Sequence, residues 1–368
     1  MDKAPMTTIK IAIVRKKQAA VLLTTVFLVF CTCRLRAETA NSASPQPAEP
    51  LISVMVGSIF DGKWGYIDKT GNFTIPPQFE SAAGFSEDLA AVELGGKYGF
   101  IDRTGEFVIP PQFDAADSFY EGIALVWLNE KFGFIDKAGK FVIKPRFTQA
   151  FGFHEQLAAV KVGEKWGYID KTGNFAIAPQ FDYALNFHKQ LAVVTIDHKA
   201  GYIDTTGKFV IAPRFPYARH FIDQLALVGL DGYGYIDKTG TIVVTPQFPL
   251  AFDFSEGLAA VSIGGGTYAY IDTTGKIAIA PQFAHAGQFS EGLADVQVEV
   301  KDRYKYGYID KTGRFAIPPQ FDYVCRFRGP LAAVRVDRKW GYIDRTGKFV
   351  ITPRFDDIWG CGIEPLGY

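Results

Sequence analysis

Nine aspartates, about 34 residues apart, are the first residues in the chain whose type and spacing could do chemistry. They are Asp68, Asp102, Asp136, Asp170, Asp204, Asp237, Asp272, Asp310 and Asp344. A ladder of carboxylates could bind Ca²⁺, but this ion takes roughly six to eight oxygen ligands, and each turn supplies a single carboxylate. An aspartate that begins a turn also accepts hydrogen bonds from the backbone N–H groups of that turn. We therefore expect these aspartates to be structural, and we expect no metal site.

Aromatic rings open the same units and could form a ladder that stacks on sugars or on a peptide. The rings are Trp64, Tyr98, Phe132, Trp166, Tyr233, Tyr268, Tyr306 and Trp340, and Ala200 is the exception. Trp, Tyr and Phe replace one another at this position. Such exchange is more typical of packing against a neighbouring unit than of one specific hydrogen bond, so we expect these rings in the core.

Histidines are few, and two of them occupy one repeat position. His154 and His188 stand where other units have Ser86 or Ser255, so adjacent units would bring the two imidazoles together. A metal pair would need further ligands, and no acidic residue or cysteine has the spacing to complete a site. The sequence therefore favours surface histidines.

Cys325 and Cys361 lie in successive units and could form a disulfide at the C-terminal end of the repeats in an oxidising compartment. They follow equivalent phenylalanines by four and six residues, and this offset works against the Cα separation of under about 7 Å that a disulfide needs.

Charged residues recur in two sets that we expect at opposite ends of each unit. Cations such as Lys137 and Lys171 sit in the aspartate turns, whereas acids such as Glu87 and Glu121 recur elsewhere in the unit. Charged, solvated edges discourage strand-to-strand aggregation, and this is the role that the sequence favours for them.

All of these residues belong to a repeat. The segment 63–79 returns at 97–113, 131–147 and 165–181, and five further copies follow. In the second copy we expect strands at 89–94 and 97–102, joined by a two-residue turn at Gly95 and Gly96. A third strand at 106–109 should stop at Pro110 and Pro111, because proline cannot donate to a ladder. The connection to the next unit should hold one helical turn or a short fourth strand.

Each aspartate turn ends in a glycine, which takes a positive φ at little cost. These glycines are Gly71, Gly105, Gly139, Gly173, Gly207, Gly240, Gly275, Gly313 and Gly347. We therefore assign them, together with the nine aspartates, to structural turns.

The fold class expected is all-β, a tandem array of nine three-stranded antiparallel units. One unit buries too little apolar surface to fold alone, so the units must stack. Propellers typically have about four to eight blades of four strands, with about 40–45 residues each. Nine units of about 34 residues depart from that pattern. The sequence therefore favours an open β-solenoid or superhelix, with a closed propeller-like ring as the alternative.

The N-terminus predicts export. Basic residues precede a run without charge at 19–33, which is short for a membrane span of about 20 residues and suits a signal peptide. We assign residues 1–37 to a signal peptide or N-terminal anchor, 38–50 to a Pro/Ala/Ser linker, 51–356 to the repeats and 357–368 to a C-terminal cap. The expected location is the periplasm or cell surface, with membrane contact only through an uncleaved N-terminal segment.

Charge excludes one class of partner. Residues 1–37 hold seven Lys or Arg and one Asp, so the remainder holds 32 basic and 38 acidic residues. A net charge of −6 argues against nucleic acid, because phosphate binding needs a basic surface.

The units KWGYIDKTGNF (63–73 and 165–175) and KWGYIDRTGKF (339–349) resemble the WG-repeat, or KWG-repeat, proteins of bacteria. The resemblance covers residues 51–356. It implies a β-rich repeat protein, often exported, with no shared catalytic residues. The chain departs from the pattern at Ala200, at Ala269 and in an insert at 299–305, where we expect looser packing or contact with a partner.

The expected function is a noncatalytic exported binding or scaffold module for a protein or a cell-envelope glycan. A structural envelope or surface spacer without a ligand is the alternative. An enzyme is the third option, and repetition argues against it because catalysis needs a unique set of residues. The chain contains no phosphate-binding loop and no GxGxxG or HExxH motif, and we expect no cofactor.

Overall fold

The computed structural model describes residues 50–58 and 60–358, which fall in a compact unit that spans residues 48–361. The predicted signal peptide or anchor, the linker up to residue 49, and the cap beyond residue 358 lie outside the described residues. Within the described ranges, no helix has the length and apolar character needed to cross a membrane.

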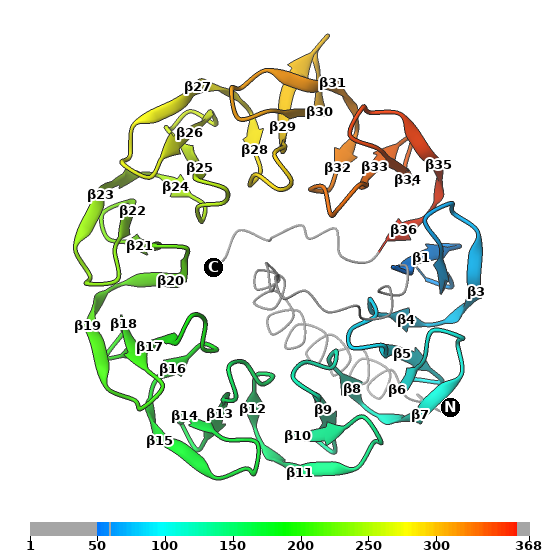
Figure 1. The fold of residues 1–368 in the computed structure, drawn as a ribbon, viewed down its shortest axis with the longest axis vertical. Coiled ribbons are helices and arrows are strands. Elements are labelled where there is room, and N and C mark those ends of the chain that lie inside the picture. The colour runs from blue at the N-terminus through cyan, green and yellow to red at the C-terminus, as the bar shows by residue number, and fades with distance from the viewer. Residues whose placement is uncertain (1–49, 59, 359–368) are drawn as a thin grey trace, which may run out of the picture. The chain divides into compact units, whose positions relative to one another are not determined.

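The described strands form nine four-stranded antiparallel sheets, which follow one another around a closed ring (Figure 1). The unit is a nine-bladed β-propeller. Our preference for an open solenoid was wrong, and the closed ring that we gave as the alternative is the observed architecture. We number the blades in ring order: blade 1 holds β1–β3 with β36, blade 2 holds β4–β7, and so on to blade 9 with β32–β35.

The innermost strands of blades 2 to 9 and then of blade 1 are short. They are β4 (Ser81–Ala82), β8 (Ala115–Ala116), β12 (Gln149–Ala150), β16 (Tyr183–Ala184), β20 (Tyr217–Ile222), β24 (Leu250–Ala251), β28 (His285–Ala286), β32 (Tyr323–Val324) and β36 (Asp357–Ile358). The second strands, in the same order, are β5 (Ala90–Leu94), β9 (Ile123–Leu128), β13 (Ala158–Val162), β17 (Leu191–Ile196), β21 (Leu225–Gly229), β25 (Leu258–Ser262), β29 (Ala294–Val300), β33 (Ala332–Val336) and β1 (Ile52–Val56).

The third strands, again from blade 2 to blade 1, are β6 (Lys97–Ile101), β10 (Lys131–Asp136), β14 (Lys165–Ile169), β18 (Lys199–Asp204), β22 (Tyr233–Ile236), β26 (Tyr268–Asp272), β30 (Arg303–Ile309), β34 (Lys339–Ile343) and β2 (Lys63–Ile67). The outermost strands are β7 (Phe107–Phe113), β11 (Phe141–Phe147), β15 (Phe175–Phe181), β19 (Phe209–Phe215), β23 (Ile242–Phe248), β27 (Ile277–Phe283), β31 (Phe315–Phe321), β35 (Phe349–Phe355) and β3 (Phe73–Phe79).

Each repeat lends its fourth strand to the next blade, and this explains the ring. Strand β3 ends at Phe79 on the rim of blade 1, and β4 begins at Ser81 as the innermost strand of blade 2. The expected three-stranded unit is therefore one strand short of a blade. Because the innermost strand is usually two residues long, a unit of about 34 residues is enough for a four-stranded blade.

Prolines do not end the outermost strands, contrary to our expectation for the third strand. Strand β7 runs through Pro110 and Pro111 to Phe113, and its pairing with β6 shifts register between Phe100↔Ile109 and Tyr98↔Phe113. An outermost strand pairs with a neighbour on one side only. Proline is tolerated there because its missing N–H removes no hydrogen bond on the side that faces away from the sheet.

The close passage of this strand explains the glycine that follows the opening aromatic. A Cβ at Gly99 would lie 2.5 Å from the Ile109 carbonyl oxygen and 2.7 Å from the Pro111 nitrogen. Backbone atoms of the outermost strand crowd seven further glycines at this position in the same way: Gly65, Gly133, Gly167, Gly201, Gly234, Gly307 and Gly341. Ala269 in blade 7 is the exception.

Apolar side chains of neighbouring blades form the core. Phe100, Ile109 and Phe113 of blade 2 belong to one buried cluster with Phe119 and Val126 of blade 3. A fully buried side chain of this size contributes roughly 1.5–3 kcal/mol. The Phe/Ile face of one blade thus packs against the Val face of the next.

The ring closes by the same interactions that join internal blades. Ile358 of β36 pairs with Val54 of β1, and the Asp356 N–H donates to the Met55 carbonyl at 3.0 Å. Asp356 also forms an ion pair with Lys339 at 2.5 Å, as Asp114 does with Lys97. The residue paired with the core valine is alanine in seven blades, Val324 in blade 9 and Ile358 at the closure.

We expect Gly167→Ala to lower the free energy of unfolding by about 2 kcal/mol, because the added Cβ would overlap the backbone of Ile177 and Pro179. Chemical denaturation measures this loss. The matched control is Ala269→Gly, which removes a Cβ at the equivalent position and should cost little. Equal losses in the two variants would contradict the crossing-strand explanation.

We expect Ile358→Ala to lower the free energy of unfolding by about 2–4 kcal/mol, since it removes a buried side chain from the blade that joins the two ends of the ring. Val324→Ala, a smaller truncation at the same position of blade 9, serves as the control. A loss no larger than that of the control would show that the closing contact is not special.

Candidate functional site

The predicted turn aspartates are held by their own turns. Asp102 Oδ1 accepts the Thr104 N–H at 2.8 Å, the Thr104 hydroxyl at 2.6 Å and the Glu106 N–H at 3.2 Å. The threonine hydroxyl is the largest of the effects that lower the pKa of Asp102. Asp136 accepts only two backbone N–H groups, because Ala138 replaces the threonine. The carboxylates are therefore spread around the ring, one to a turn, instead of converging on one pocket.

The turn glycines mark the contact between blades. Gly105 has a φ of +94°, and a Cβ there would lie 3.1 Å from Ile75 of the preceding blade. Both the backbone conformation and the neighbouring side chain exclude a larger residue. The aspartate and glycine of a turn thus place it against the blade before it.

The turn cations lie beside the recurring glutamates, and our expectation that the two sets occupy opposite ends of the unit was wrong. Lys137 of blade 3 pairs with Glu87 of blade 2 at 3.2 Å, and Lys171 of blade 4 pairs with Glu121 of blade 3 at 3.2 Å. Lys311 with Glu256 and Arg345 with Glu291 repeat the contact. The charges of one unit complement those of the next, which a single unit does not reveal.

Blades 5 to 7 interrupt this chain of ion pairs. Thr205 and Thr273 replace the turn cation in blades 5 and 7, and Lys189 replaces the glutamate in blade 5. Lys189 pairs instead with Asp223 of blade 6 at 3.2 Å. The repeat is therefore irregular in this sector, which includes blades 5 and 6.

A second irregularity lies in the inner loops, at the residue before the loop phenylalanine. We call this set the inner tier: Gly84, Ser118, Gly152, Asn186, His220, Asp253, Gln288 and Arg326, in blades 2 to 9. Blades 2 to 4 contribute glycine or serine, whereas blades 5 to 9 contribute larger polar side chains. One half of the ring thus carries polar groups that the other half lacks.

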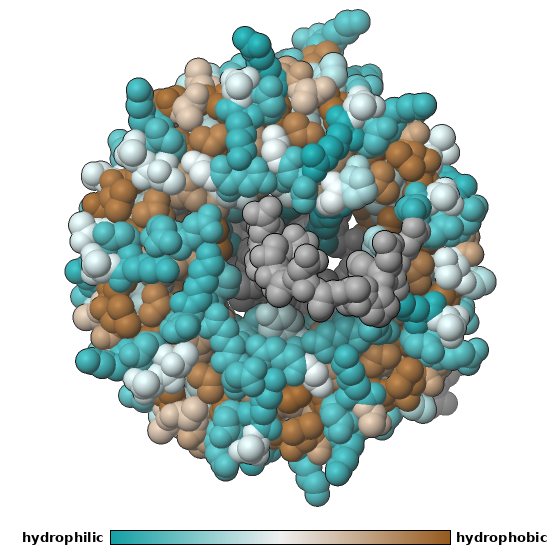
Figure 2. Space-filling model, in the orientation of Figure 1, coloured by the Kyte–Doolittle hydropathy of each residue, from teal (hydrophilic) through white to brown (hydrophobic). Residues whose placement is uncertain are grey.

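Polar side chains of the inner tier link adjacent blades from blade 6 to blade 9. The Arg326 guanidinium donates to Gln288 Oε1 at 3.3 Å, and the Gln288 amide donates to the Asp253 carbonyl at 3.1 Å. Arg219 of blade 6 forms an ion pair with Asp253 at 3.1 Å. Figure 2 shows mostly hydrophilic residues around the middle of the face in view.

Among the described residues, the buried inner-tier atoms without a hydrogen-bond partner include Asn186 Oδ1 in blade 5 and His220 Nδ1 in blade 6. The Asp253 carboxylate in blade 7 is held by its ion pair with Arg219. Only 7% of Asn186 is exposed. A buried polar atom without a partner costs about 1–3 kcal/mol, so two of them in neighbouring blades call for a functional explanation.

Histidines extend the site along the inner loops of blades 3 to 6. Tyr120 stacks on His154 with ring centroids 4.5 Å apart, and the His188 and His220 centroids are 6.0 Å apart. His154 and His188 also influence each other electrostatically. We call Tyr120, His154, His188 and His220 the histidine row.

Burial is the largest cause of the low pKa values in this row. It lowers the pKa of His154 to about 4 and that of His220 to about 3, and it lowers the pKa of His188. The structure places His154 and His188 together, as their shared repeat position predicts, but half-buried instead of on the open surface. Within the described residues, no three or more His, Cys, Asp or Glu side chains are arranged to hold a metal ion.

Sequence reasoning missed His220 and Asn186. His220 precedes the loop phenylalanine, whereas His154 and His188 follow it, so an alignment of repeats places His220 at a different position. An available signal was the change from Gly84 and Gly152 to large polar residues at the inner tier. That Asn186 lacks a partner depends on the three-dimensional packing.

The opening aromatics are divided between core and surface. Phe132, Trp166 and Trp340 are buried, as predicted, whereas Trp64, Tyr98, Tyr233, Tyr268 and Tyr306 are half-buried. The most exposed rings beside them are Tyr183 and Tyr217, which begin the innermost strands of blades 5 and 6.

The departures from the repeat differ from one another. Ala200 and Ala269 are buried, so neither residue opens the surface. The insert at 299–305 lengthens the hairpin of β29 and β30, which projects past the neighbouring blades in Figure 1. Tyr304 near its tip is 57% exposed.

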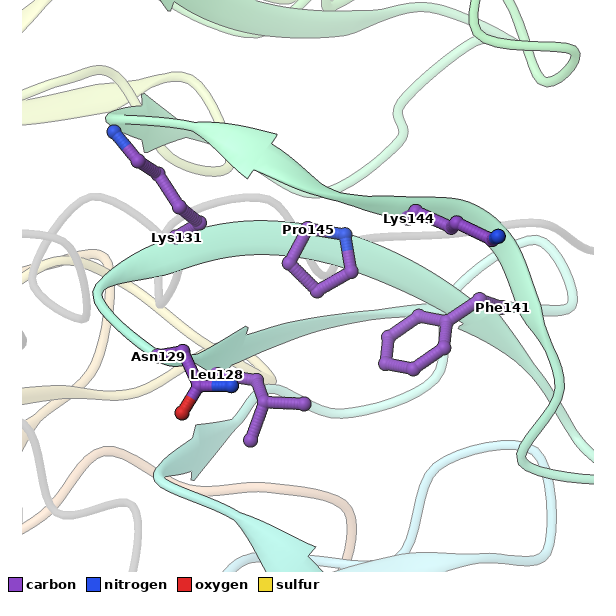
Figure 3. A pocket seen from close by; sticks show the side chains of 6 residues that line it. All are labelled: Leu128, Asn129, Lys131, Phe141, Lys144 and Pro145. Carbon is purple, nitrogen blue, oxygen red and sulfur yellow. The ribbon is translucent and has the colours of Figure 1, made fainter.

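A pocket on the rim of blade 3 is lined by Leu128, Asn129, Lys131, Phe141, Lys144 and Pro145 (Figure 3). Apart from Lys144 and Asn129, its residues repeat in other units as Leu94, Lys97, Phe107 and Pro111. The pocket is a product of the shared scaffold, and it offers no distinctive set of polar groups.

The predicted disulfide reaches beyond the described residues. Cys325 is disulfide-bonded, but Cys361 lies outside those residues. The pairing of Cys325 with Cys361 stays a prediction.

The chain matches the family described as WG containing repeat nine times. The matches cover residues 64–98, 98–132, 132–166, 166–199, 201–232, 233–266, 268–301, 306–340 and 340–360. No curated protein sequence matches the chain.

Solved structures similar to the chain include BamB from Moraxella catarrhalis, at 14% identity and a TM-score of 0.39, covering 74% of this chain and 89% of that one. Hsv2p of Kluyveromyces lactis has 9% identity and a TM-score of 0.38, with 61% and 89% covered. Apo AztD from Citrobacter koseri has 13% identity and a TM-score of 0.36, with 72% and 93% covered. Likeness at this level says nothing about a ligand.

The low histidine pKa values predict a loss of stability in acid. Below about pH 6.5 the unfolded chain binds protons on these imidazoles that the folded chain excludes. The neutral imidazoles therefore make their full contribution to the free energy of unfolding above about pH 6.5. This contribution declines as the pH falls toward about 4. A variant with glutamine at His154, His188 and His220 should therefore show a flatter decline.

Thermal unfolding between pH 7.5 and pH 4.5 measures the difference. The carboxyl groups contribute equally to the pH dependence of variant and parent, so their effect cancels in the comparison. They include Asp117, whose pKa is raised by burial to about 6. His198→Gln is the control, because His198 lies exposed in a hairpin turn. An unchanged pH dependence in the triple variant would show that these histidines do not limit stability in acid.

Proposed function

The chain belongs to the WG containing repeat family, and we propose that it is a noncatalytic binding protein whose site is the irregular sector of the propeller. The ligand is a protein or a cell-envelope glycan, and the protein acts outside the cytoplasm. The site comprises the histidine row together with Asn186.

One observation carries this proposal: Asn186 Oδ1 and His220 Nδ1 lack hydrogen-bond partners in the sector where the inter-blade ion pairs are interrupted. Repetition satisfies most polar groups in the same way in every blade. Asparagine and histidine each occupy the inner-tier position in a single blade, so neither is needed to build a blade. Their cost is offset if a ligand completes the hydrogen bonds.

A binding role suits the chemistry of this sector better than a catalytic one. The turn carboxylates are occupied within their own turns. The imidazoles lie in a row along successive blades, and burial lowers their pKa values far from neutrality. A general base works best with a pKa near the operating pH.

The proposed location outside the cytoplasm rests on the sequence of residues 1–37, with its basic start and uncharged run. A structural spacer without a ligand is the competing proposal, favoured by the regularity of the other blades. A spacer has no need for unpaired polar atoms, and this difference separates the two.

The test is a glycan array and a pull-down from envelope extract with the full chain and with His188→Ala. We expect one class of ligand to be retained by the parent and bound at least tenfold more weakly by the variant. Tyr304→Ala, on the projecting hairpin of blade 8, is the control that should bind normally.

Failure of every probe to bind would favour the spacer. Equal binding by parent and His188→Ala would place the site elsewhere. A turnover that survives purification and is abolished by one substitution would refute the noncatalytic role.

A further inference from the structure

We propose that Asn186 and His220 form the polar centre of a saccharide-binding site, with Tyr120 and His154 as its stacking surface. This inference rests on the proposed function, and it names an uncharged, hydroxyl-rich ligand for the same site.

The two unpaired atoms define what the ligand must supply. Asn186 follows β16 in blade 5 and His220 lies on β20 in blade 6, both on the innermost segments of the ring (Figure 1). Equivalent side chains of blades 7 to 9 reach from one blade to the next, as Arg326 does to Gln288. Asn186 and His220 hold equivalent inner-tier positions in adjacent blades, 5 and 6, so we place them in one site.

A hydroxyl group suits both atoms because it donates and accepts. It satisfies the Asn186 amide in either orientation, and it satisfies His220 Nδ1 in either tautomer of the neutral ring. A ligand with neighbouring hydroxyls, as on a sugar ring, can therefore complete both groups at once.

Charge argues against ionic ligands. Arg219, the full charge beside His220, is paired with Asp253 at 3.1 Å. The imidazoles are uncharged at neutral pH because burial lowers their pKa values. Arg219 and Lys189 of this sector are each paired with a carboxylate, which weakens their attraction for a phosphate or carboxylate ligand.

Ring surfaces continue the site on the neighbouring blades. Tyr120 stacks on His154, and Tyr120 is 41% exposed. The row then passes from His154 through His188 to His220, 6.0 Å from His188. Flat apolar faces beside hydrogen-bonding groups match a sugar, which has apolar C–H faces and a polar edge.

Small inner-tier residues leave the stacking surface uncrowded. Ser118 and Gly152 occupy the tier in blades 3 and 4, where the row presents Tyr120 and His154. The large polar residues of the inner tier begin at Asn186 in blade 5.

The experiment is calorimetric titration of the full chain with glucose, galactose, N-acetylglucosamine, maltose, lactose and chitobiose. Glucuronic acid and inorganic phosphate are the charged comparisons. We expect at least one neutral sugar to bind, and glucuronic acid and phosphate to bind more weakly or not at all.

Two variants test the assignment to these atoms. Asn186→Leu removes the unpaired oxygen at similar volume, and His220→Phe keeps the ring without its nitrogens. Each should weaken sugar binding at least tenfold while the melting temperature stays the same or rises, because a buried polar atom without a partner is removed. Asn129→Leu, on the hairpin of blade 3, is the matched control.

The outcomes separate this inference from the proposed function. If no neutral sugar binds, or if phosphate binds better, the saccharide site is refuted. If another ligand still depends on His188, the binding role stands and the saccharide assignment falls. A fall in melting temperature without a change in sugar binding assigns Asn186 and His220 to the fold alone.

Discussion

The propeller depends on a strand that each repeat gives to its neighbour. Three strands of a unit make most of one blade, and a strand that is usually two residues long completes the next. A blade is therefore never the product of one repeat. Backbone hydrogen bonds join each unit to the next, in addition to the apolar contacts between blades, and the ring is complete when β36 pairs with β1. This linkage explains how units of about 34 residues form a ring.

The repeats also indicate which residues are available for function, because residues that make the same contact in several blades serve the scaffold. Turn aspartates, turn glycines, cations and glutamates each meet the same partner in several blades, so they serve the scaffold. The groups left over are few and lie together. Asn186, His220 and their neighbouring imidazoles occupy the sector where the inter-blade ion pairs are interrupted. The propeller has approximate ninefold symmetry, and this sector is one part of the ring that differs from the rest.

Local patterns in the sequence predicted local structure well. The second strand of the second copy was expected at 97–102, and β6 runs over Lys97–Ile101, because its alternation and flanking turns are encoded within a few residues. The predicted end of the third strand at Pro110 and Pro111 was wrong. Whether a proline interrupts a strand depends on whether that strand pairs on one side or on both. Closure could not be predicted, because a two-residue strand carries almost no periodic signal. Two of the five residues of the candidate site, His154 and His188, could be recognised from their shared repeat position. His220 was hidden by its shift from the histidine position of the repeat.

The pairing of β36 with β1 also constrains the order of events during synthesis. Residue 54 is made about 300 residues before residue 358, its partner across the closing sheet. Until then, β1 presents an unpaired strand edge, which is a template for association with another chain. Blades 2 to 9 can form as the chain emerges, because each needs only the repeat just completed. Blade 1 must wait until residue 358 has been made, so a chain that stops before this point would keep a strand edge that the closed ring conceals.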